Sequence, residues 1–172
     1  KLSDVPAPEV FDAKDKNWVE IWNDVFMQYI KDEKGNYNPA SQKNVDTGMG
    51  LERLSMIVQG KANIFESDLF APIVDLLPSG MDGRIKRIIA DHVRGTAFLI
   101  SDGVLPSNKE AGYILRRLIR RMLVYEHIAS AKFNLSNLLK ELVVNYKDFY
   151  GELTIESVFA EFNLEKDKFQ KS

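Results

Sequence analysis

The stretch NVDTGMGLERL, residues 44–54, marks the point at which the chain changes from strand to helix. Two glycines, Gly48 and Gly50, close an extended run, and the apolar residues after them recur at helical spacing. Asp46 stands before the glycines and Arg53 after them. Glycine lets backbone approach a ligand closely, a carboxylate accepts hydrogen bonds from ammonium groups, and a guanidinium binds phosphate at two points. The junction is a candidate site for a small charged ligand, although a turn aspartate and a solvated arginine give the same pattern.

A strand pair is predicted to lead into this junction. Residues 17–30, NWVEIWNDVFMQYI, are rich in aromatic and β-branched side chains and alternate in polarity, which is typical of a strand. The polar segment 31–41 contains Gly35 and Pro39 and predicts a turn. We expect residues 44–50 to return as the second, antiparallel strand.

The rest of the chain is predicted to be helical, because apolar residues recur at three- and four-residue spacing between glycine and proline breaks. Gly60 and Gly103 are each expected to end a helix. Ser107 and Glu110 form a capping-box pattern that would begin one helix. The expected helices cover residues 51–59, 67–77, 85–102, 107–122, 135–150 and 154–170. The fold class is therefore α+β: a short antiparallel strand pair followed by a helical array, with residues 1–64 and 65–172 as the two domains.

Composition excludes several kinds of site. The chain has no cysteine, so it forms neither disulfides nor thiolate metal sites. His92 and His127 lie far apart without a zinc-type spacing, so we predict no metal site. No stretch approaches the roughly 20 apolar residues of a membrane helix, and we expect a cytoplasmic protein without a membrane partner. Because the chain begins with Lys1 rather than Met, we expect a piece of a longer protein.

Basic residues are concentrated in the middle of the chain. Residues 84–124 contain nine Lys and Arg and three Asp and Glu, a local charge of +6 (nine minus three) in a chain of net charge −2. Four arginines form two adjacent columns opposite an apolar stripe; they are Arg116, Arg117, Arg120 and Arg121. Such an array suits phosphate binding, and a solvated, salt-bridged helix face explains it equally well.

Four blocks of the sequence resemble one family, the alanyl-tRNA synthetases, which are class II aminoacyl-tRNA synthetases. NVDTGMGLERL is similar to motif 3 of that class, and VEIWNDVFMQ, residues 19–28, to the strand before it. RIIADHVRGTAFLISDGVLPSN, residues 87–108, and GYILRRLIRR, residues 112–121, resemble the helical segment that follows. The blocks occur in the family's order and cover most of residues 17–125, which is too long an agreement for chance.

The resemblance implies an enzyme that joins alanine to ATP as alanyl-adenylate and then transfers alanine to the 3′ end of its tRNA. Arg53 occupies the motif 3 arginine position, which implies a catalytic contact with the ATP phosphates. Asp46 matches the aspartate that holds the amino group of alanine, and Gly48 and Gly50 would keep that pocket open and small. The implied mechanism is positioning together with electrostatic stabilisation.

Three residues of the preceding strand are implied to line the same pocket; they are Glu20, Trp22 and Asn23. Trp22 is expected to contact alanine, whereas Glu20 or Asn23 is expected to contact ATP or its magnesium. ATP and Mg²⁺ are expected for the full-length enzyme, and neither is expected to bind this segment alone.

The helical segment is implied to bind the acceptor stem of alanine tRNA. Asn108 matches an asparagine that reads the G·U wobble pair of that stem, and an amide suits a base edge in the minor groove of A-form RNA. A position at the start of a capped helix explains Asn108 equally well. Arg120 or Arg121, together with Arg116 and Arg117, would bind the nearby RNA backbone.

Parts of the family's enzyme are expected outside this chain. Motifs 1 and 2, which supply further ATP contacts, would precede Lys1, so the chain alone should not form adenylate. The acidic partner of Asn108 and the editing domain with its zinc would lie beyond Ser172. The strand pair would then expose an edge, which we expect to pair with another copy or to be covered by the first sixteen residues.

Three hypotheses stand at this point. The chain is a segment of the enzyme, a free-standing helical RNA-binding module that retains motif 3, or a helical scaffold without a ligand. Asp46 beside Gly48 favours the enzyme segment, because a protein that only binds RNA has no use for that pair.

Overall fold

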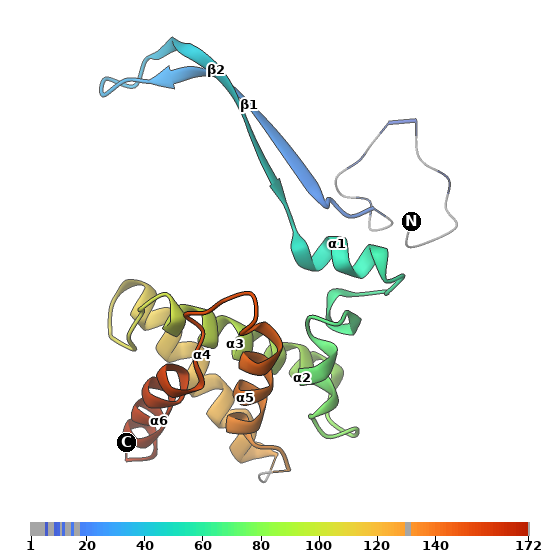
Figure 1. The fold of residues 1–172 in the computed structure, drawn as a ribbon, viewed down its shortest axis with the longest axis vertical. Coiled ribbons are helices and arrows are strands. Elements are labelled where there is room, and N and C mark those ends of the chain that lie inside the picture. The colour runs from blue at the N-terminus through green and yellow to red at the C-terminus, as the bar shows by residue number, and fades with distance from the viewer. Residues whose placement is uncertain are drawn as a thin grey trace. The chain divides into compact units, whose positions relative to one another are not determined.

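The chain forms two units (Figure 1). The computed structural model describes residues 18–129 and 132–171, together with Pro6, Glu9, Val10, Asp12 and Asp15. The first unit covers Lys1–Ser67 and contains a strand pair and a helix, and the second covers Asp68–Ser172 and is helical where described. The predicted α+β order, a strand pair followed by a helical array, is confirmed. The two units divide a few residues after the predicted boundary at residue 64.

A two-stranded antiparallel ribbon dominates the first unit. β1 (Trp22–Lys31) pairs with β2 (Tyr37–Met49). The pairing is regular from the Met49 end as far as Met27 opposite Asn44, and an irregularity follows. The described residues 18–21 are not in the strand, so β1 begins later than predicted, and β2 begins well before the predicted residue 44.

Asp32 explains why the turn is shorter than the predicted segment 31–41. One carboxylate oxygen accepts hydrogen bonds from the backbone amides of Lys34 (3.0 Å) and Asn36 (2.8 Å). The other accepts from the side-chain amides of Asn36 and Asn38, each at 3.2 Å. These bonds close the turn within a few residues, so that β2 begins at once. Led by the Asn36 backbone amide, they stabilise the charged form and lower the pKa of Asp32 below its usual 3.8.

Helix α1 (Leu51–Val58) follows β2 directly, as predicted. Gly50 precedes it in an extended conformation, with φ −75° and ψ 107°. The predicted stop at Gly60 is confirmed by a φ of +64°, which glycine adopts without strain. A 3-10 helix, η1 (Ile64–Glu66), contacts α1 and completes the unit.

The second unit, called the helical unit, is arranged around one long helix. Its helices are α2 (Ala71–Asp75), α3 (Gly83–Ser101), α4 (Glu110–Ile128), α5 (Leu135–Tyr146) and α6 (Ile155–Gln170). Helix α3 contacts α2, α4, α5 and α6. The helix predicted over residues 67–77 is reduced to α2, because Pro72 is tolerated only in the first turn of a helix.

Apolar stripes of these helices form a closed core. Fully buried side chains come from all five helices; they include Ile73, Val93, Ile119, Leu139 and Phe162. Most of the stripes predicted for α3 and α4 are buried. Of the helices that the structure describes, none is both long and apolar enough to span a lipid bilayer.

The predicted capping box at the start of α4 does not form. The Ser107 hydroxyl accepts from the Lys109 amide (3.2 Å) and donates to the Lys109 carbonyl (3.0 Å) instead. Glu110 has a φ of +49°, a left-handed conformation uncommon outside glycine, and Lys109 occupies the cap position without a side-chain cap. The alternative role of Asn108, as the first residue of a capped helix, is therefore wrong.

Candidate functional site

The ribbon brings part of the predicted site together on one face. Residues directly opposite each other in antiparallel strands project to the same face. Asn23 lies opposite Gly48, and Val25 lies opposite Asp46. Asn23, Asp46 and Gly48 therefore share one face, which we call the Asp46 face.

Trp22 lies on the other face. It pairs with Met49, and its indole Nε1 donates a hydrogen bond to the Thr47 hydroxyl. Successive residues of a strand point to opposite faces. The expectation that Trp22 lines the same side of the strand pair as Asp46 is therefore wrong for the ribbon itself.

Arg53 reaches the Asp46 face from the first turn of α1. The Gly50 amide donates to the Ile21 carbonyl (3.0 Å), which continues the ladder to the start of the helix. A Cβ built on Gly50 would lie 3.5 Å from both Cγ and Cδ of Arg53, so the arginine stem covers that side of Gly50. Positions 46, 48 and 50 alternate along one strand, so this side belongs to the Asp46 face.

A backbone carbonyl holds the Arg53 guanidinium in place. Its Nη1 donates to the Glu20 carbonyl at 2.6 Å. A guanidinium has five N–H donors, so this bond fixes the side chain and leaves other donors for an anion. Glu20 thus supplies a backbone carbonyl, and a contact of its carboxylate with ATP or Mg²⁺ stays a prediction. Within the described ranges, no three His, Asp or Glu side chains gather into a metal-binding group.

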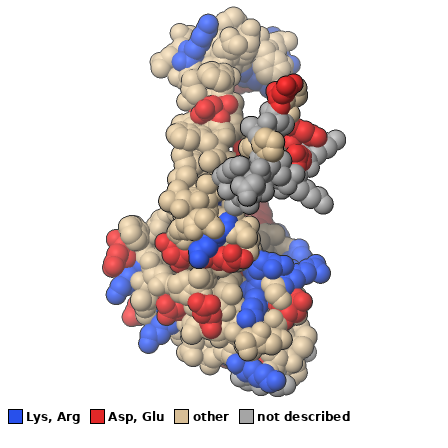
Figure 2. Space-filling model, turned by 90° about the vertical axis from the view of Figure 1, so that its right-hand side faces the viewer, with Lys and Arg blue, Asp and Glu red and all other residues tan. Residues whose placement is uncertain are grey.

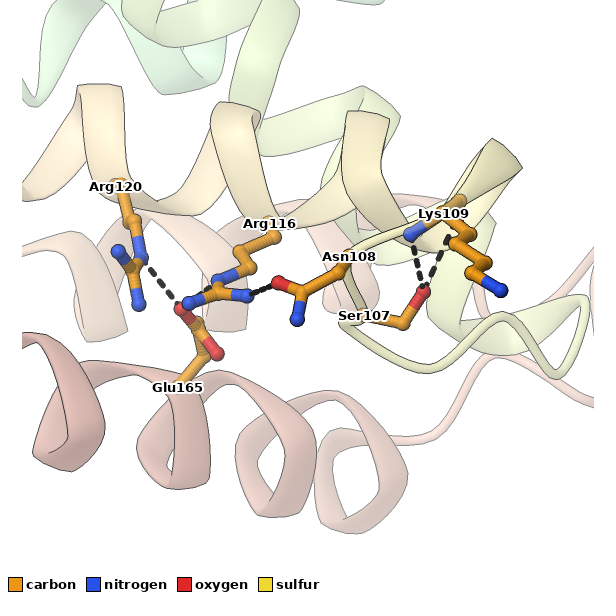
Figure 3. Close-up of polar contacts among 6 residues, drawn as sticks. All are labelled: Ser107, Asn108, Lys109, Arg116, Arg120 and Glu165. Atoms are coloured by element: carbon orange, nitrogen blue, oxygen red, sulfur yellow. Dashed lines mark hydrogen bonds and ion pairs between the residues drawn. The ribbon is translucent and has the colours of Figure 1, made fainter.

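The four arginines of α4 have two environments. Arg116 and Arg120 are half-buried and bind one carboxylate oxygen of Glu165 in α6 (Figure 3). Glu165 Oε1 accepts from Arg116 Nε at 3.1 Å and from Arg120 Nε at 2.6 Å, and Glu165 is only 2% exposed. One of the two predicted columns is therefore part of the packing between α4 and α6.

Arg117 and Arg121 form the exposed column. The Arg117 guanidinium lies over the Tyr113 ring, 5.7 Å from its centroid, and that of Arg121 lies over the Tyr125 ring at 5.8 Å. Stacking restrains a guanidinium and leaves its N–H donors at the edge. Basic and acidic side chains are interspersed on the face shown in Figure 2. These two restrained arginines, rather than the overall charge, are thus the candidates for phosphate binding.

Asn108 lies in the loop before α4, where Arg116 Nη1 donates to its Oδ1 (Figure 3). Gly112 lets this loop pack against the helix. The Ser107 amide donates to the Gly112 carbonyl at 3.1 Å, and a Cβ at Gly112 would come within 2.3 Å of Ser107 Oγ. Any larger residue at position 112 would therefore displace the loop that carries Asn108.

Two residues that support the site, Glu165 and Gly112, were not predicted from the sequence. Glu165 follows Val158 and Phe162 at four- and three-residue spacing, so a carboxylate stands on the apolar stripe of α6. An acid at such a position signals a buried partner. A glycine inside a helical pattern has a similar significance, because it often permits a close approach of backbone.

Comparison with known proteins places the chain in a family. Residues 3–172 match the family model described as tRNA synthetases class II (A). The chain is 44% identical over 169 residues to the alanine–tRNA ligase of Borrelia hermsii, a match that covers 90% of this chain and 28% of that protein. It is 46% identical over 145 residues to the alanine–tRNA ligase of Elusimicrobium minutum, covering 79% of this chain and 17% of that protein.

A third relative gives the same result. The chain is 40% identical over 158 residues to the alanine–tRNA ligase of Neisseria meningitidis, covering 88% of this chain and 18% of that protein. The chain thus spans less than a third of the length of these curated relatives. From the family match over nearly every residue, we conclude that this chain belongs to the class II tRNA synthetases (A) and is similar to one segment of their alanine–tRNA ligases.

Proposed function

We propose that the chain is the part of an alanine–tRNA ligase in which the aminoacylation core ends and the tRNA-binding helices begin. The full-length protein activates alanine with ATP and transfers it to the 3′ end of alanine tRNA in the cytoplasm. In the first step, an oxygen of the alanine carboxylate bonds to the α-phosphorus of ATP and pyrophosphate leaves. Mg²⁺ accompanies the ATP as part of that substrate.

The residues of the Asp46 face bind and orient the two small substrates. The Asp46 carboxylate accepts hydrogen bonds from the ammonium group of alanine. Gly48 and Gly50 leave room beside it, and the anchored Arg53 donates to phosphate oxygens as negative charge builds on them. No residue acts as a nucleophile, so the contribution is positioning together with charge stabilisation.

The helical unit binds the acceptor stem. The exposed amide of Asn108 contacts a base edge in the shallow minor groove, and Arg117 and Arg121 bind phosphates nearby. Arg116 and Arg120 support this surface through Glu165.

One observation carries the proposal for the first unit: the register and the Gly50 contact put Asp46, Gly48 and the Arg53 stem on the same face of one ribbon. An RNA-binding module or a helical scaffold has no need of such an arrangement. The ribbon also supplies a matched control, because Asp24 is a second carboxylate that pairs with Thr47 on the opposite face.

ATP–pyrophosphate exchange by the full-length protein tests this proposal. Arg53→Ala should lower the exchange rate about 10²- to 10³-fold, as the loss of one preorganised charge-stabilising donor does. Asp46→Asn should raise the KM for alanine about tenfold or more, because a charge-assisted hydrogen bond is lost. Asp24→Asn should leave both unchanged. Equal effects of Asp24→Asn and Asp46→Asn would contradict a site on the Asp46 face.

Two further parts of the proposal concern the ribbon's surroundings. The family's motifs 1 and 2 supply the remaining ATP contacts, so the chain by itself forms no adenylate. In the separate chain, the outer edges of β1 and β2 pair with those of a second copy, as exposed strand edges tend to do. Sedimentation velocity over a range of concentrations tests this pairing, and a monomer at all concentrations would contradict it.

A further inference from the structure

Glu165 is a charged residue in an apolar environment. It lies on α6 in line with Val158 and Phe162, both fully buried, and is itself 2% exposed. A buried carboxylate is strongly unfavourable unless other groups compensate its charge and fill its hydrogen-bonding capacity. Two arginines of α4, Arg116 and Arg120, supply that compensation.

The two arginines converge on one atom. Arg116 Nε and Arg120 Nε both donate to Glu165 Oε1, at 3.1 and 2.6 Å. Bonds through Nε fix the plane of each guanidinium, because Nε lies within that plane at its inner end. Arg120 is further restrained by the Phe169 ring, 5.3 Å from its guanidinium carbon. The terminal nitrogens of Arg116 are therefore directed by Glu165.

Arg116 passes this constraint to Asn108. Its Nη1 donates to Asn108 Oδ1. A guanidinium has donors only, so the amide oxygen of Asn108 has to face Arg116, and the amide nitrogen has to point elsewhere. Figure 3 shows that nitrogen turned away from Arg116. Asn108 is exposed, so the nitrogen is available to a partner.

This inference rests on the proposed function. We propose that Glu165 is a positioning residue for tRNA specificity: through Arg116 it sets the orientation of the Asn108 amide, so that the amide presents a hydrogen-bond donor to the base pair it reads. A fixed donor selects an acceptor at one position on the minor-groove base edge, such as the O2 of a pyrimidine, and a wobble pair displaces that O2 relative to a Watson–Crick pair. An amide free to rotate would present a donor or an acceptor and would discriminate less.

The test uses the full-length protein and two acceptor-stem minihelices that differ only in carrying a G·U or a G–C pair at the position read. The measured quantity is the ratio of kcat/KM for aminoacylation of the two stems. Glu165→Gln should lower this ratio on the order of tenfold, the effect expected of one mispositioned base contact. ATP–pyrophosphate exchange should stay unchanged, because the residues proposed for the first step belong to the first unit and Glu165 belongs to the helical unit.

A double variant separates positioning from general packing. In an Asn108→Ala background, Glu165→Gln should cause no further fall in the ratio, since the amide it orients is gone. A fall of the same size in both backgrounds would overturn the inference. The inference would also be overturned if Glu165→Gln kept the wild-type ratio while Asn108→Ala lowered it. That result would leave the proposed function intact.

Circular dichroism shows whether Glu165→Gln folds. If it does not fold, a second variant tests the same inference. Arg116→Lys keeps a positive charge beside Glu165 but lacks the planar guanidinium, in which Nε binds Glu165 while Nη1 binds Asn108, so Glu165 no longer fixes the direction of the Asn108 amide. A lowered ratio supports the inference, and an unchanged ratio overturns it. If the wild-type protein charges neither minihelix, the proposed function itself fails.

Discussion

The two units differ in how they bury their side chains. Every residue of β1 is exposed, and so is every residue of β2 except Ala40, whereas each helix of the helical unit has at least one fully buried apolar side chain. A two-stranded ribbon is marginally stable by itself, while a helical array with a closed core supports its own fold. The difference teaches that the residues proposed to bind alanine and ATP lie on an element that buries little of its own surface, whereas those proposed to bind RNA are ordered by the core of their own unit.

The largest expected effect concerns the core of the helical unit. Leu139→Ala removes a fully buried side chain, and we expect a loss of about 2–5 kcal/mol in the free energy of unfolding. Phe26→Ala on the ribbon, where the side chain is 77% exposed, should change it by less than about 0.5 kcal/mol. Urea unfolding followed by circular dichroism measures both. Similar losses for the two variants would remove the contrast between the units.

The second prediction compares a buried and an exposed carboxylate within the helical unit. Glu165→Ala leaves Arg116 and Arg120 without their shared acceptor, and we expect a cost of about 1–3 kcal/mol, because both arginines keep some access to water. Asp167→Ala removes an exposed carboxylate from the same helix and should be nearly neutral. Urea midpoints at neutral pH compare the two variants, and equal midpoints would show that the buried carboxylate contributes little.

A third prediction separates the two arginine columns. The double change Arg117→Ala and Arg121→Ala should leave the free energy of unfolding unchanged. It should lower the slope of the logarithm of the minihelix binding constant against the logarithm of the salt concentration by about one for each arginine, because each loses one phosphate contact. Filter binding over a series of salt concentrations measures the slope. The matched control is Lys140→Ala with Lys147→Ala, which removes two exposed charges from α5 and its C-cap. An identical slope for both double variants would mean that only net charge matters.

The smallest effect belongs to the ribbon turn. The pKa of Asp32 lies below 3.8 in the folded chain, so its hydrogen bonds contribute stability above the unfolded pKa, and this contribution is lost as the pH falls through the folded pKa. The Asn36 amide resonance, followed by NMR against pH, should titrate with a midpoint below 3.8. Asp32→Asn should abolish this titration. A midpoint at or above 3.8 would contradict the turn geometry.

Helices and their ends were predicted correctly where one periodic pattern of apolar residues determined the structure. The helical stripe that includes Val93 and Ala97 is buried in α3, and Gly60 and Gly103 have the positive φ expected of glycines that end helices. The start of β2 was missed, because Asp32 closes the turn through side-chain hydrogen bonds that no hydrophobic pattern reveals.

The site was only partly predictable for a related reason. Motif resemblance gave Asp46, Gly48 and Arg53, which the register brings to one face. It also gave Trp22 together with Asn23, although adjacent residues of one strand point to opposite faces. The ion pairs with Glu165 join residues from two helices distant in the sequence, and pairing of that kind depends on tertiary packing.

The placement of the indoles has a practical consequence. Both tryptophans of the chain, Trp18 and Trp22, belong to the first unit, and the aromatic residues of the helical unit are phenylalanine and tyrosine. Trp22 is 56% exposed beside Thr47. Tryptophan fluorescence of this chain, excited at the red edge of protein absorption, therefore reports on the first unit alone. An unlabelled sample distinguishes a ligand that reaches the strands from one that docks only on the helices.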